Sequence, residues 1–136
     1  MSVRGRSGQT IGASVLACLL LFAVSASAES ILQFDLLMQR IEHKSQSVQR
    51  NLARQDAAAA IADAQDMADM YGQMDRFFQQ RADSQRAVRL SRDGSSLAVS
   101  MAQLAAQRDF AAASRQALAI VHACRDCHED YKPLDP

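Results

Sequence analysis

The chain has 136 residues, which is the length of one domain, and 49% of them are hydrophobic. Its 15 basic residues balance its 15 acidic residues, so the formal net charge is zero. This balance excludes a protein that holds nucleic acid through a surplus of positive charge.

The first 28 residues have the pattern of a secretory signal peptide. Arg4 and Arg6 precede an apolar run over residues 11–24, and small residues then form an A-x-A-like cleavage site that ends at Ala28. The run is shorter than the roughly 20 apolar residues that a membrane-spanning helix needs. We therefore expect cleavage after Ala28 and export of the chain to the periplasm.

In this interpretation residues 29–136 form the mature domain. Removal of Arg4 and Arg6 with the leader leaves 13 basic and 15 acidic residues, a net charge of −2. An uncleaved anchor and a lipid attached at Cys18 are the alternatives, although the apolar run continues past Cys18. In the mature chain, a disulfide between the two remaining cysteines, Cys124 and Cys127, would close a tiny loop and stabilise the fold little.

The mature chain has the composition and periodicity of an all-α domain. No proline occurs between Ala28 and Lys132, and the helix-forming residues Ala, Leu, Gln and Arg dominate. Apolar residues recur at steps of three and four, as they do on one side of a helix. We predict four helices, near residues 30–53, 57–80, 84–106 and 110–132.

Short polar segments separate the predicted helices. Asp56, Asp83 or Ser84, and Asp109 stand where they can cap the N-termini of the helices that follow. Helices of matched length that are joined by short connections pack as antiparallel neighbours. The predicted fold is therefore an antiparallel, up-down-up-down four-helix bundle.

Gly94 has two interpretations. It lies within the turn-like segment SRDGSS, residues 91–96, and could break the third helix there. It also keeps the apolar side of that helix in register, where a small residue would make room for a bulky neighbour. The sequence leaves both open.

The segment CRDCH, residues 124–128, carries the clearest chemical pattern in the chain. C-x-x-C-H is typical of c-type haem attachment. On a helix, Cys124, Cys127 and His128 project from one side. The two thiols can then add to the two vinyl groups of a porphyrin while the imidazole reaches the iron as proximal ligand. This side is also the apolar side of the fourth helix, which predicts a haem inside the bundle.

A zinc site and a redox dithiol are the alternatives for this segment. Structural zinc needs four converging ligands, and His122 lies about 200° round a helix from Cys124, so it would require a broken helix. A thioredoxin-like dithiol lies where a strand meets a helix, whereas nothing in the sequence indicates a strand. We therefore predict one haem c, attached covalently through Cys124 and Cys127.

With CRDCH on the last of four predicted helices, the chain resembles the class II c-type cytochromes, the cytochrome c-prime family. The residues after the motif, Glu129, Asp130, Tyr131 and Lys132, match that family's acidic, aromatic and basic positions. The chain departs from the family in having no Pro-rich crossover between the second and third helices and no tryptophan. The resemblance implies a haem protein that is not an enzyme. It implies an electron carrier if the iron has six ligands, and a protein that binds nitric oxide or carbon monoxide if it has five.

The resemblance also suggests residues around the haem. The family places a distal residue on the first helix, near the position of Met38, so we expect Met38 to be the sixth ligand. The alternative is that Met38 fills the core. Tyr131 would pack on the haem edge or in the core, and Lys132 matches the basic position that shapes the proximal pocket.

Other residues have weaker assignments. The haem propionates would find their basic partners among the residues nearest in helix register, which are Arg40, Arg54, Arg125 and Lys132. His43 and His122 are expected to face solvent. The expected partners are periplasmic or membrane redox proteins that act as electron donor and acceptor. A second copy of the chain and a larger complex in which the haem serves as a relay are the alternatives.

Overall fold

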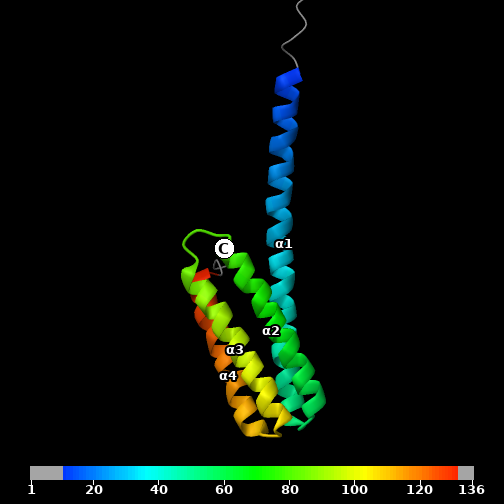
Figure 1. Cartoon of the computed structure of the whole chain (residues 1–136), viewed down its shortest axis with the longest axis vertical. Coiled ribbons are helices and arrows are strands. Elements are labelled where there is room, and N and C mark those ends of the chain that lie inside the picture. The colour runs from blue at the N-terminus through cyan, green and yellow to red at the C-terminus, as the bar shows by residue number, and fades with distance from the viewer. Residues whose placement is uncertain (1–10, 132–136) are drawn as a thin grey trace, which may run out of the picture. The chain divides into compact units, whose positions relative to one another are not determined.

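The structure is a computed structural model that describes the backbone of residues 11–131 and the side chains of residues 31–131. Over this range the chain forms helices and no strand, as Figure 1 shows. The four helices are α1 (Ile11–Ala53), α2 (Ala57–Gln79), α3 (Gln85–Ala106) and α4 (Phe110–Tyr131). Within the described residues, the bounds of the last three helices agree with the prediction to within one residue. The end of α1 also agrees, but its helical backbone begins well before residue 30, inside the predicted leader.

The chain divides into two compact units, Met1–Asp35 and Leu36–Pro136. The predicted cleavage after Ala28 falls in the first unit, where the side chains before Ile31 lie outside the described residues. The signal peptide therefore stays a prediction. Within the described part of the chain, no helix is both long enough and apolar enough to cross a membrane.

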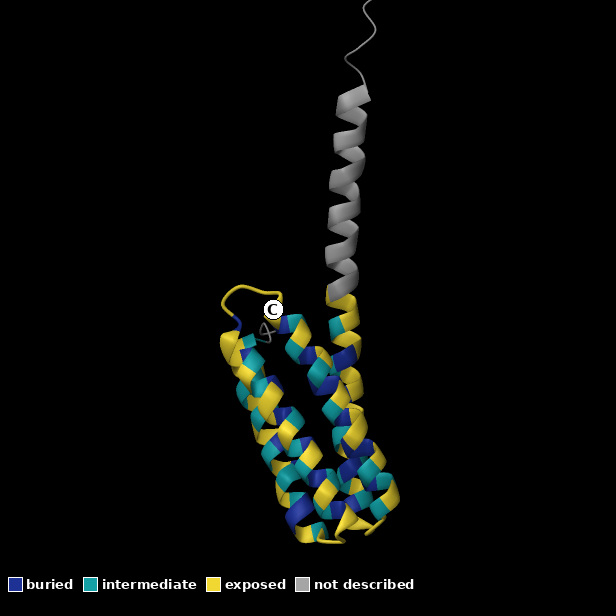
Figure 2. Cartoon of the chain, viewed as in Figure 1, coloured by how far each residue is buried: buried dark blue, intermediate teal, exposed yellow. Residues whose placement is uncertain are grey.

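The second unit is the four-helix bundle that the sequence predicts. Short connections reverse the chain after each of the first three helices, so that the α1 residues from Leu36 onward and the three following helices alternate in direction (Figure 1). Helix α3 packs along both α2 and α4. Figure 2 shows that the buried residues of this unit follow the inner sides of the helices. Short connections between amphipathic helices produce this antiparallel arrangement.

The core of the bundle combines alanine with methionine. Met67 and Met101 are completely buried, and Met70 is 2% exposed. Ala60, Ala64, Ala87, Ala98, Ala105 and Ala113 have no exposed surface. Small alanines let helix backbones approach each other, while the flexible methionine side chains fill the irregular gaps that remain.

The connections after α1 and α3 share one turn design. Each has a residue in the left-handed region, Gln55 with φ of 59° and Arg108 with φ of 60°. The N–H of the next residue, Asp56 or Asp109, donates to the carbonyl oxygen five residues earlier, Asn51 or Leu104, which is a Schellman-type helix ending. The same aspartate then caps the next helix, because its carboxylate accepts a backbone N–H at 3.1 Å or 2.9 Å. Both predicted caps are confirmed.

The predicted cap of α3 lies at the expected position but lacks the expected hydrogen bond. Ser84 is the N-cap residue of α3, but its side chain makes no capping bond. Its buried hydroxyl instead donates to the carbonyl oxygens of Phe78 at 2.6 Å and Arg81 at 2.7 Å. Ser84 thus ties the start of α3 to the last turn of α2 and to the connection that follows it. Asp83 lies in the left-handed region with φ of 56°.

A buried carboxylate joins α1 to α2. Asp63 accepts hydrogen bonds from Lys44 Nζ and from Asn51 Nδ2, both at 2.8 Å. Lys44 also pairs with Asp66 at 2.6 Å. Burial alone would raise the pKa of Asp63, but hydrogen bonds from Lys44, Ser47 and Asn51 and the charge of Lys44 outweigh it and lower this pKa below its ordinary value. The carboxylate is therefore charged in the folded protein at neutral pH.

We expect Asp63→Asn to lower the free energy of unfolding by about 1–2 kcal/mol at pH 7, because it removes the charge that Lys44 and Asn51 stabilise. Since the folded state has the lower pKa, this stabilisation is present above the ordinary value of 3.8 and is lost as the pH falls through the folded value. Urea denaturation at pH 7 and at pH 3 measures the difference between variant and wild type. The exposed Asp69→Asn serves as the control. A difference of the same size at both pH values would contradict this assignment.

Candidate cofactor-attachment site

The CRDCH segment lies in the last turns of α4, and its backbone is helical as predicted. Cys124 and Cys127 are one turn apart on this helix, and both thiols are unpaired and half-buried. His128 is exposed. The two thiols therefore lie at the inner side of α4, whereas the imidazole, predicted on the same apolar side, lies at its solvent-exposed border.

The hydroxyl of Tyr71, on α2, is the hydrogen-bond partner of Cys124. Tyr71 Oη lies 3.5 Å from Cys124 Sγ, and either atom can be the donor. The Tyr71 side chain is deeply buried, with 4% of the residue exposed. Burial first, and then the neighbouring Cys124 and Cys127, raise the pKa of Tyr71 above its ordinary value. The phenol is therefore protonated throughout the neutral range.

Gly94, on α3, makes room for the Tyr71 ring. Helix α3 runs unbroken through Gly94, so the interpretation of a helix break is wrong and that of space for a bulky neighbour is confirmed. A Cβ atom at Gly94 would lie 2.6 to 2.8 Å from three carbon atoms of the Tyr71 ring, which is closer than real Cβ contacts. We call this arrangement of Gly94, Tyr71 and Cys124, from three different helices, the tyrosine notch.

The second thiol has a different environment. Burial first, and then Cys124, raise the pKa of Cys127 above its ordinary value, while the charge of Arg86 acts in the opposite direction. Arg86 also forms an ion pair with Asp130. This pair joins the start of α3 to the end of α4, beside the attachment segment.

The remaining predicted site residues are placed as follows. Tyr131 is half-buried, and its ring packs against Phe78 with 5.5 Å between the ring centroids, which agrees with the core-packing interpretation. Met38 is half-buried on α1, next to the buried Leu37. Lys132 lies outside the described residues. Nothing in the structure tests Met38 as a ligand, and that assignment stays a prediction.

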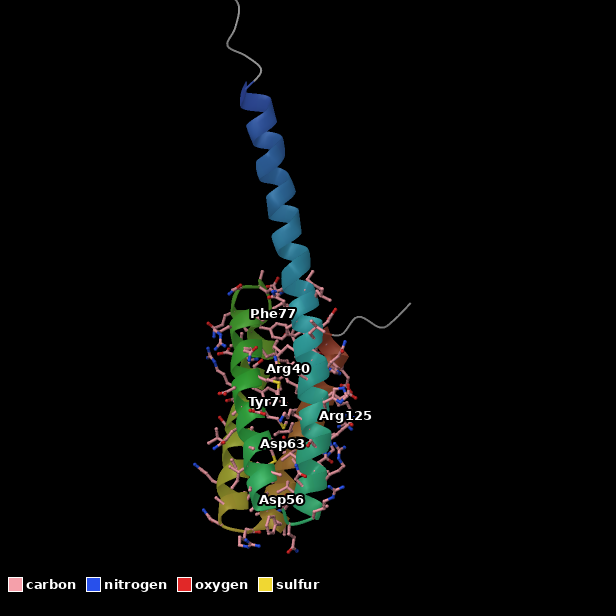
Figure 3. The ribbon with its side chains drawn as sticks, turned by 90° about the vertical axis from the view of Figure 1, so that its right-hand side faces the viewer. Arg40, Asp56, Asp63, Tyr71, Phe77 and Arg125 are labelled. Carbon is pink, nitrogen blue, oxygen red and sulfur yellow. The ribbon has the colours of Figure 1, made fainter. Side chains whose placement is uncertain are left out.

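Figure 3 shows where labelled residues from three helices of the bundle lie. Figure 3 labels Arg40 on α1, Tyr71 on α2 and Arg125 on α4 in the same middle region of the bundle. Met38 precedes Arg40 by about half a turn, and Cys124 directly precedes Arg125.

Arg125 interacts with residues of its own helix. Its Nη2 atom lies 3.3 Å from His122 Nδ1, and its Nε atom lies 3.8 Å from Asp126 and 4.0 Å from Glu129. Its charge is therefore partly compensated on the surface of α4. The other basic and histidine residues of the prediction are exposed, as expected for a solvated surface: Arg40, Arg54, His43 and His122.

Among residues 31–131, no three His, Cys, Asp or Glu side chains lie close enough together to hold a metal ion. Comparisons of the chain with protein-family models, with curated proteins and with solved structures find no match.

The residues of α4 fit a covalently attached haem by their chemistry. The two thiols are unpaired and one turn apart, and the His128 imidazole next to them is accessible.

Proposed function

We propose that the chain is an exported c-type cytochrome, similar to the class II cytochromes, that transfers single electrons in the periplasm. One observation carries the proposal. The last helix of a four-helix bundle presents two unpaired, half-buried thiols one turn apart, with a histidine directly after the second. This set of groups, in this spacing, suits haem c.

Each protein group has a defined role in the proposal. Cys124 and Cys127 would hold the haem through two thioether bonds. In each, the thiol S–H adds across a vinyl C=C bond, so that one carbon gains the sulfur and the other gains the hydrogen, without net oxidation. His128 would supply the proximal imidazole. The bound haem supplies one-electron chemistry, while the bundle sets its ligands, burial and access.

The distal side of the iron would be closed by Met38. We expect Met38→Ala to convert a low-spin spectrum into a high-spin one and to remove the weak far-red band of methionine bound to iron. The reason is that the variant has no thioether to complete the coordination. The control is Met101→Leu, which removes a buried thioether of α3 at nearly constant volume and should leave the band in place. An unchanged spectrum in Met38→Ala would exclude ligation by Met38.

The proposed function is tested by the absorption spectrum of the exported protein, oxidised and reduced, with and without carbon monoxide. A low-spin spectrum that does not respond to carbon monoxide supports an electron carrier whose partners are periplasmic or membrane redox proteins. A high-spin spectrum that responds would replace this function with binding of nitric oxide or carbon monoxide. A protein without covalent haem would overturn both.

A further inference from the structure

The tyrosine notch distinguishes the two cysteines of CRDCH. Cys124 Sγ has a hydrogen-bond partner, the Tyr71 hydroxyl at 3.5 Å, whereas Cys127 has no such bond among the described residues. Only one of the two sulfur atoms is therefore held by a polar contact from another helix.

The position of the Tyr71 hydroxyl is itself constrained. The ring is almost fully buried, and it packs against α3 at the buried Gly94, where a side chain would collide with it. A buried aromatic ring enclosed in this way has little rotational freedom, so its hydroxyl is held towards Cys124. The contact is thus built from the backbone of α3, the ring from α2 and the sulfur from α4.

Thioether formation would fix which atom donates the hydrogen bond between Tyr71 and Cys124. In the free chain either Tyr71 or Cys124 can donate the hydrogen bond. Once Sγ is bonded to a porphyrin side chain it carries no hydrogen, so it can only accept. The Tyr71 hydroxyl keeps its proton and can donate in both states.

We propose that Tyr71 is a positioning residue that holds Cys124 Sγ at the inner side of α4, in the orientation needed for haem attachment. This inference rests on the proposed function, because the reaction that it assists is thioether formation. Orientation of a reacting atom before reaction lowers the entropic part of the barrier. The effect should be specific for Cys124, since Tyr71 makes no hydrogen bond to Cys127.

The test compares Tyr71→Phe with wild type in two measurements. The variant keeps the ring in the notch and removes only the hydroxyl, and thermal denaturation checks that the fold is intact. The first measurement adds ferrous haem to the reduced, haem-free full chain and follows thioether formation by mass spectrometry. Trypsin cleavage after Arg125 places Cys124 and Cys127 in different peptides, so the haem mass in singly attached chains reports which cysteine has reacted, while doubly attached chains give the two peptides linked through the haem. The second measurement follows alkylation of each cysteine by iodoacetamide without haem.

We expect Tyr71→Phe to slow thioether formation at Cys124 by about fivefold, the value of one hydrogen bond of about 1 kcal/mol, and to leave Cys127 unchanged. The rate of alkylation should change in the opposite direction. In Tyr71→Phe, Cys124 should react with iodoacetamide several times faster than in wild type, because its sulfur is free to rotate towards solvent. The control is Ser91→Ala, which removes another buried hydroxyl, one that donates to Ala87 within α3. Ser91→Ala should leave the ratio of the Cys124 rate to the Cys127 rate at its wild-type value, both for thioether formation and for alkylation.

Wild-type rate ratios of Cys124 to Cys127 in both measurements of Tyr71→Phe would overturn the positioning role. If wild type forms no thioether but the alkylation ratio still shifts in Tyr71→Phe, the proposed function fails while the control of Cys124 by Tyr71 is upheld. The two failures are therefore distinguishable.

Discussion

Replacement of Cys124 and Cys127 by serine together is expected to abolish covalent haem attachment completely. The physical reason is that a serine hydroxyl does not replace the thiol in the addition to a vinyl group, so neither thioether forms. Both side chains are only half-buried, and sulfur and oxygen differ little in size, so the helical fold should persist. Haem staining of the exported chain on a denaturing gel, together with its intact mass, measures attachment.

Single variants and a leader variant complete this experiment. Cys124→Ser and Cys127→Ser should each retain one thioether at the remaining cysteine. Cys18→Ser changes a cysteine of the predicted leader and should leave attachment unaffected. Haem that stays with the double variant through denaturation would refute the assignment of these two cysteines.

Gly94→Ala is expected to lower the free energy of unfolding by about 1–3 kcal/mol, although alanine alone is favoured over glycine in a helix by about 1 kcal/mol. The new Cβ atom would lie 2.6 Å from Tyr71 Cε1, and the ring belongs to a residue that is only 4% exposed. The helix or the ring must therefore shift. Urea denaturation followed by far-ultraviolet circular dichroism measures the change.

Gly72→Ala is the matched control for this prediction. A Cβ atom at Gly72 would meet only Arg76 Nη1, the mobile end of a long side chain, at 3.6 Å. We therefore expect Gly72→Ala to stabilise the protein by about 0.5–1 kcal/mol through helix propensity alone. In a Tyr71→Leu background the cost of Gly94→Ala should become smaller, because the ring that it meets is gone. A gain in stability for Gly94→Ala equal to that of Gly72→Ala would contradict the tyrosine notch.

The bundle contains buried polar contacts between helices, at Asp63 and at Tyr71, in addition to apolar packing. Asp63 is 7% exposed and joins two positions of α1 through its hydrogen bonds to Lys44 and Asn51. Tyr71 carries a hydroxyl into the core and finds a sulfur partner on α4. Both buried polar groups are satisfied by partners from other helices, and such contacts fix the relative rotation of helices more sharply than apolar packing does.

Features that depend on neighbouring residues could be predicted from the amino-acid sequence alone. Apolar periodicity and the aspartates Asp56 and Asp109 predicted the helices, their N-termini and hence an antiparallel bundle. The helical backbone of the CRDCH segment agrees with the same periodicity. Cap and turn signals are readable because they act over only three to six residues.

Contacts between side chains that are distant in sequence could not be predicted, because they depend on how the helices pack. The sequence predicts Asp83 or Ser84 as the cap of α3, but the Ser84 hydroxyl bonds the end of α2, because the chain turns back on itself there. Gly94 left a helix break and a packing notch equally open, and the choice depended on Tyr71, which is far away in sequence. His128 lies at the exposed border of α4, whereas the sequence predicted it on the apolar side. These outcomes depend on the rotation of each helix about its axis and on its axial offset from its neighbours. Periodicity within one helix specifies neither quantity.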